Sequence, residues 1–79
     1  MNKYKDRSNI SGKIINKARI ENNLSLEKLS NKLQLIGITL YPNDLFLIEN
    51  EKRIVKDFEL IAICKVLNID IKNVKRELD

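Results

Sequence analysis

The scarcity of helix-breaking residues constrains the fold of this chain more than any other feature. Only Gly12, Gly37 and Pro42 interrupt its 79 residues. Elsewhere, apolar residues recur at spacings of three and four, which is the period of a helix with one buried face. Alternation of apolar and polar residues, the pattern of a half-buried strand, is weak, and there is no internal repeat. The sequence therefore predicts an all-α fold.

Five helices follow from this spacing and from residues suited to helix ends. They are expected over residues 11–22, after Ser25, over 42–50, over 57–67 and from 70 onward. Ser11, Ser25 and Asp57 are the predicted N-terminal caps, because their side-chain oxygens accept hydrogen bonds from the first backbone N–H groups of a helix. The segment 35–40 is a connector that is apolar enough to pack onto the core.

Length and composition limit the class of protein. A chain of 79 residues, 43% hydrophobic and 33% charged, is typical of one soluble globular domain with a small core. Its apolar runs fall short of the roughly 20 residues of a membrane helix. No apolar stretch follows the basic N-terminus, so we expect no signal peptide. Together with the single cysteine, Cys64, this indicates a reducing, cytoplasmic setting.

Residues that commonly carry catalysis or bind metals are scarce. The chain has no histidine, no cysteine pair, no glycine-rich phosphate loop and no nucleophile motif. We therefore expect a protein that is not an enzyme and that has no metal and no cofactor. Cys64 is interpreted as a small hydrophobic residue of the core.

The charge of the chain suits a nucleic-acid partner. The net charge is +4 and the pI is about 9.3. Basic residues are concentrated in the first part of the chain, against Asp6 alone: Lys3, Lys5, Arg7, Lys13, Lys17 and Arg19. This distribution predicts a basic arm over residues 1–9 and a domain over 10–79, with arm and first helix lying along phosphates. The alternative is a solvated tail and a solvated helix face.

A set of residues across the chain resembles a known family. In chain order, the set is Arg19, Leu24-Ser25-x-x-x-Leu29-Ser30, Leu45-x-x-Ile48-Glu49, Lys52-Arg53 and Leu60-x-x-Ile63-Cys64-x-x-Leu67. It is similar to the Cro/phage-repressor helix-turn-helix family, often called the XRE family, over roughly residues 10 to 71. The segment Gly37-Ile38-Thr39-Leu40 resembles a branch of that family with a lengthened turn before the recognition helix. The resemblance implies a five-helix Cro/repressor-like domain.

The resemblance also implies roles for individual residues. Arg19 and Glu49 match a family pair that ties the first helix to the end of the recognition helix, and this pair is structural. Ser30 stands where the family usually has alanine, so its hydroxyl needs a partner. Leu26 stands where the family commonly has glutamine, so one polar contact to DNA is lost.

The expected recognition helix follows Tyr41. Its outward residues by analogy are Tyr41, Pro42, Asn43, Asp44, Phe46 and Leu47. Asn43 suits adenine, and Tyr41 and Phe46 suit thymine methyl groups. Asp44 accepts a hydrogen bond either from a cytosine amino group or from the start of its own helix. Candidate phosphate contacts are Lys13, Lys17, Lys28, Lys32, Lys52 and Arg53.

The expected function is that of a sequence-specific regulator of transcription, a repressor, that binds double-stranded DNA. A homodimer is expected, because a single module of this size buries too little DNA for high specificity. The candidate dimer surfaces are Ile71, Val74 and Leu78, or Phe58, Ile61 and Val66. The preferred alternative is that these residues close the core.

A second class of function stays open. The expected recognition helix is poor in basic residues, and exposed Phe46 and Leu47 would form an apolar patch of the kind that marks protein contacts. The alternative is a protein-interaction module, such as a regulator's partner or an antitoxin-like component, that binds protein through Tyr41, Phe46 and Leu47.

Overall fold

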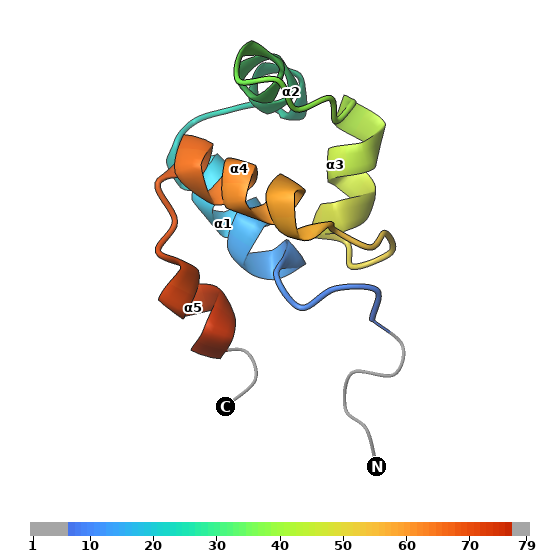
Figure 1. The fold of residues 1–79 in the computed structure, drawn as a ribbon, viewed down its shortest axis with the longest axis vertical. Coiled ribbons are helices and arrows are strands. Elements are labelled where there is room, and N and C mark those ends of the chain that lie inside the picture. The colour runs from blue at the N-terminus through green and yellow to red at the C-terminus, as the bar shows by residue number, and fades with distance from the viewer. Residues whose placement is uncertain (1–6, 77–79) are drawn as a thin grey trace.

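A computed structural model describes residues 7–76, and all of its regular elements are helices (Figure 1). They are α1 (Gly12–Glu21), α2 (Leu26–Leu35), α3 (Pro42–Glu49), α4 (Asp57–Leu67) and α5 (Ile71–Lys75). The prediction of an all-α fold is confirmed for these residues, which contain no strand. None of the described helices is long and apolar enough to cross a membrane.

The first four helices enclose one core. Its buried members are Ile15, Leu29, Leu33, Leu40, Leu45, Ile48, Ala62, Ile63 and Leu67. Helix α2 packs against α3 and α4, and α1 packs against α3 and α4. Figure 1 shows α5 at the opposite end of the molecule from α2. Val74 is the buried residue of α5.

Two helix starts differ from the prediction. Ser11 occupies the cap position of α1, but its side chain makes no capping bond; instead the Oδ1 atom of Asn9 accepts from the backbone N–H groups of Ser11 and Gly12, at 3.1 and 2.9 Å. Asp57 is the first helical residue of α4 rather than its cap. Lys56 takes the cap position, and its N–H donates to Glu59 Oε1 at 3.0 Å.

The remaining helix ends follow local chemistry. The Oγ atom of Ser25 accepts from the Lys28 N–H at 3.1 Å, as predicted. Asn23 and Asn68 adopt left-handed conformations, with φ of 57° and 58°, just after α1 and α4. Asparagine tolerates this conformation better than most residues, which explains why these helices end there.

The connector between α2 and α3 only partly packs onto the core. Leu40 is buried, whereas Leu35 is 87% exposed and Ile36 is also exposed, so the prediction is wrong for these two residues. The last turn of α2 directs Leu35 to the solvent side, and Gly37, with φ of 85°, reverses the chain. Ser30 Oγ donates to the Leu40 carbonyl at 2.6 Å. This bond satisfies the buried hydroxyl and holds the end of the connector against α2.

Candidate nucleic-acid interface

An ion pair fixes the end of α3 against α1. Glu49, the last residue of α3, is 7% exposed. Its Oε2 atom accepts from Arg19 Nε at 2.7 Å, and its Oε1 atom accepts from Arg19 Nη2 at 3.0 Å. Asn16 Nδ2, one turn earlier on α1, donates to Oε1 at 2.7 Å. The carboxylate therefore receives three hydrogen bonds from one face of α1.

Arg19 also reaches the segment before α2. Its Nη1 atom donates to the Leu24 carbonyl at 2.8 Å, so one guanidinium joins α1, the approach to α2 and the end of α3. The hydrogen bonds to Glu49 raise the pKa of Arg19 above its ordinary value, since they favour the charged form more than burial opposes it. This arrangement is scaffold, because both side chains are turned into the protein, with 15% and 4% of their surface exposed.

A second set of contacts, made by Asn9 and Gly12, joins the start of α1 to the end of α3. Asn9 Nδ2 donates to the carbonyls of Ile48 and Arg53, at 3.0 and 2.9 Å. The backbone approaches closely at Gly12, where a Cβ atom would lie 2.4 Å from the Ile48 oxygen and 2.8 Å from the Glu49 oxygen. The sequence did not predict these contacts. The only local signal was a glycine one residue after a serine suited to capping.

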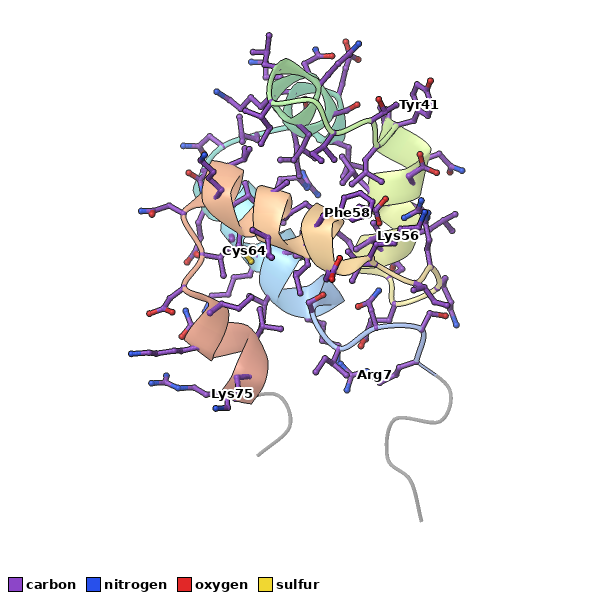
Figure 2. The ribbon with its side chains drawn as sticks, viewed as in Figure 1. Arg7, Tyr41, Lys56, Phe58, Cys64 and Lys75 are labelled. Carbon is purple, nitrogen blue, oxygen red and sulfur yellow. The ribbon has the colours of Figure 1, made fainter. Side chains whose placement is uncertain are left out.

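The described end of the predicted basic arm is bound to the turn after α3. Arg7 forms an ion pair with Glu51, and the Ser8 N–H donates to the Glu51 carbonyl at 3.0 Å. Figure 2 shows Arg7 below α1. Residues 1–6 of the arm, including Lys3 and Lys5, lie outside the described residues.

The outer face of α3 carries two exposed aromatic residues. Tyr41, at the start of the helix, is 66% exposed, and Phe46 is 51% exposed. Figure 2 shows Tyr41 at the end of α3 nearest to α2. Asn43 is also exposed. Leu47 is half-buried, so the predicted exposure of that residue is wrong; its place on the helix turns it partly towards the protein.

Asp44 serves the start of its own helix, one of its two expected roles. Its Oδ2 atom accepts from the Tyr41 N–H at 2.9 Å, and its other oxygen lies 3.9 Å from Arg53 Nε. Arg53 Nη1 in turn donates to Glu59 Oε1 at 3.3 Å. Arg53 thus bridges the start of α3 and the start of α4, and the negative charge of Asp44 is compensated within the protein.

The lysines predicted to contact phosphates lie on several different elements. Lys28 and Lys32 are exposed on α2, one helical turn apart, and Lys52 is exposed just after α3. Lys13 lies beside the end of α3, in a shallow hollow whose wall includes Glu49. Lys17 instead lines a groove between α1 and the segment around α5, so the structure separates it from the others.

The candidate dimer residues divide into exposed and buried ones. Phe58 is 54% exposed and Ile61 is 63% exposed, so the expectation that they close the core is wrong. Val66 is half-buried and packs against the core. In the last helix, Val74 is buried and Ile71 is exposed; Leu78 lies outside the described residues.

The described residues offer little reactive chemistry. They contain no group of three or more His, Cys, Asp or Glu side chains that would hold a metal ion. Cys64 is 6% exposed, and burial raises the pKa of its thiol, which favours the unreactive neutral form. Exposed large hydrophobic residues lie on the outer face of α3 and on one face of α4.

Comparison of the chain with family models, with curated proteins and with solved structures finds no match.

Proposed function

We propose that this protein binds double-stranded DNA through α3 and regulates transcription, as a repressor built like the Cro/phage-repressor helix-turn-helix domains with a lengthened turn. The observation that carries the proposal is that some residues of α3 hold the helix against the protein while others are left exposed. Its inward residues and both of its ends are bound to the rest of the protein, whereas Tyr41, Asn43 and Phe46 project outward. A helix held rigidly with its outer face uncovered is the arrangement that inserts into a major groove.

The chemistry of the outer face suits a site rich in A·T pairs. An asparagine amide pairs with the N6 and N7 atoms of adenine, and apolar side chains contact the thymine methyl group. Asn43 supplies the amide, and the rings of Tyr41 and Phe46 supply apolar surface. The compensation of Asp44 by the Tyr41 N–H and by Arg53 weakens the repulsion that a carboxylate would otherwise exert on phosphates.

The exposed lysines around α3 supply phosphate contacts. Lys28 and Lys32 come from α2, Lys13 from α1 and Lys52 from the turn after α3. Such contacts determine orientation on the duplex but carry no sequence information. Arg53 contributes less than these lysines in this proposal, because its guanidinium is already paired with two carboxylates.

The test is fluorescence anisotropy of labelled A·T-rich and G·C-rich duplexes over a salt series. The wild-type protein should prefer the A·T-rich duplex, and Asn43→Ala should lose about 1–3 kcal/mol of that preference. Lys28→Ala should weaken binding to both duplexes alike and lower the salt slope by about one. Asn73→Ala, an exposed asparagine of α5, is the matched control. Binding of equal strength to both duplexes, unchanged by Asn43→Ala, would refute base reading.

A specific observation favours a second candidate, a protein-interaction module that uses the same helix. Helix α3 contains no lysine or arginine, and exposed aromatic side chains lie at its N-cap, Tyr41, and on its outer face, Phe46. Aromatic residues are enriched where proteins bind one another. Phe46→Ala separates the candidates: it weakens DNA binding if α3 lies in the groove, and it leaves DNA affinity unchanged if the face binds protein.

A further inference from the structure

The start of α4 presents an apolar surface that the described part of the chain leaves uncovered. Ile54 is 70% exposed, Ile61 is 63% exposed and Phe58 is 54% exposed. The opposite face of the helix is used by the core, through residues such as Ile63 and Leu67. Figure 2 shows Phe58 and Lys56 at the start of α4, and Lys56 Nζ lies 5.9 Å from the centre of the Phe58 ring.

Charges flank this surface in a regular order. Asp57, Ile61 and Lys65 are spaced by four residues, so they lie in one row along the helix, and all three are exposed. The row is acidic at its beginning, apolar in the middle and basic at its end. One oxygen of Asp57 accepts from the Phe58 N–H. Both Asp57 and Lys65 are exposed to solvent.

The charges of this row are complementary to those of the same row on a second chain that runs antiparallel to it. A two-fold axis at Ile61 would place Asp57 of one chain opposite Lys65 of the second copy, and the reverse pair would form at the other end. A two-fold interface uses the same patch on both chains, so each attractive pair occurs twice. We propose that the exposed face of α4 is a self-association surface and that its occupant is a second copy of this chain, packed antiparallel through Ile61.

The charge order favours a second copy over other occupants. A parallel arrangement would set Asp57 against Asp57 and Lys65 against Lys65, and like charges facing each other across an interface repel. DNA is disfavoured by Asp57 at one end of the row. Three apolar side chains cover less than the roughly 800 Å² per partner of a standard interface, so the dimer forms only at high protein concentration.

The experiment is sedimentation equilibrium without nucleic acid, from low micromolar to near-millimolar protein, so its outcome is independent of the proposed DNA binding. The wild-type chain should dimerise within this range. Asp57→Lys and Lys65→Glu should each raise the dissociation constant at least about tenfold, because each turns two attractive pairs into repulsive ones. An equimolar mixture of the two variants should associate again, since both cross-pairs in the mixed dimer are attractive.

Two further variants make the test specific. Ile61→Ser should abolish association, and Lys72→Glu, a charge reversal at an exposed position of α5, should leave it unchanged. Circular dichroism checks that each variant stays helical. A wild-type chain that is monomeric throughout the range overturns the proposal, as does a dimer that survives Ile61→Ser. If the wild type dimerises but the mixed variants fail to associate, the antiparallel pairing of Asp57 with Lys65 is overturned.

Discussion

Replacing Glu49 by alanine should remove a large part of the free energy of unfolding. The carboxylate receives three hydrogen bonds, two from the Arg19 guanidinium and one from Asn16, and its side chain is 4% exposed. Its removal leaves the Arg19 charge, 15% exposed, without its carboxylate partner. Stranding one member of a buried ion pair costs about 3–5 kcal/mol, because the remaining charge stays desolvated.

This loss is large for a chain of this length. Domains are stabilised by about 0.05–0.15 kcal/mol per residue, which gives about 4–12 kcal/mol here. A loss of 3–5 kcal/mol therefore brings the domain close to unfolding, and it lowers Tm by about 12–40 °C at the usual sensitivity of small domains. The partial exposure of Arg19, which lets water solvate the stranded charge, favours the lower end of both ranges.

Urea and thermal unfolding, followed by far-ultraviolet circular dichroism, measure the effect. Glu21→Ala is the control, because Glu21 is an exposed glutamate on α1 and its loss should change stability by less than about 0.5 kcal/mol. Replacing both members of the pair by apolar residues, Arg19→Met with Glu49→Leu, should restore part of the loss, since no charge is then stranded. If Glu49→Ala unfolds like Glu21→Ala, the ion pair does not stabilise the fold and the reasoning fails.

Two further predictions concern buried groups. Gly12→Ala should destabilise the protein by about 1–3 kcal/mol despite the better helix propensity of alanine, because the new Cβ would meet the backbone oxygens of Ile48 and Glu49. Lys13→Ala is the control. Equal Tm values for the two variants would contradict this prediction. The raised pKa of the Cys64 thiol means that its contribution to stability is present below the ordinary thiol pKa and is lost as pH rises through the raised value. The free energy of unfolding should therefore fall at alkaline pH in the wild type, and it should fall less in Cys64→Ala. Iodoacetamide should label the thiol of the native protein slowly at neutral pH. Rapid labelling would refute the argument that burial protects this thiol.

Most helix positions could be predicted because their signals are local. Pro42 begins α3 as expected, Ser25 caps α2 through its hydroxyl, and Asn68 ends α4 in a left-handed conformation. The failures at helix starts also have a local cause. Several polar residues stand near each start, and the sequence does not say which of them reaches the backbone; Asn9 caps α1 in place of Ser11.

Among the candidate residues of α3, exposure could be predicted for some and not for others. Tyr41, Asn43 and Phe46 are exposed on α3, as expected for its outer face. Leu47 is half-buried, because the orientation of a helix on its core decides the exposure of residues at the edge of its apolar stripe. Arg53 was interpreted as a phosphate contact, yet its guanidinium lies between two carboxylates from different parts of the chain.

By itself, the sequence determined that this chain is helical and roughly where its helices lie, because helix propensity, capping and breaking depend on residues within a turn or two of each other. Only the tertiary structure decided which apolar residues meet water, as Ile61 does, and which charges compensate one another, as Arg53 and Asp44 do. Both depend on how helices from distant parts of the chain cross, and local spacing carries no information about that crossing.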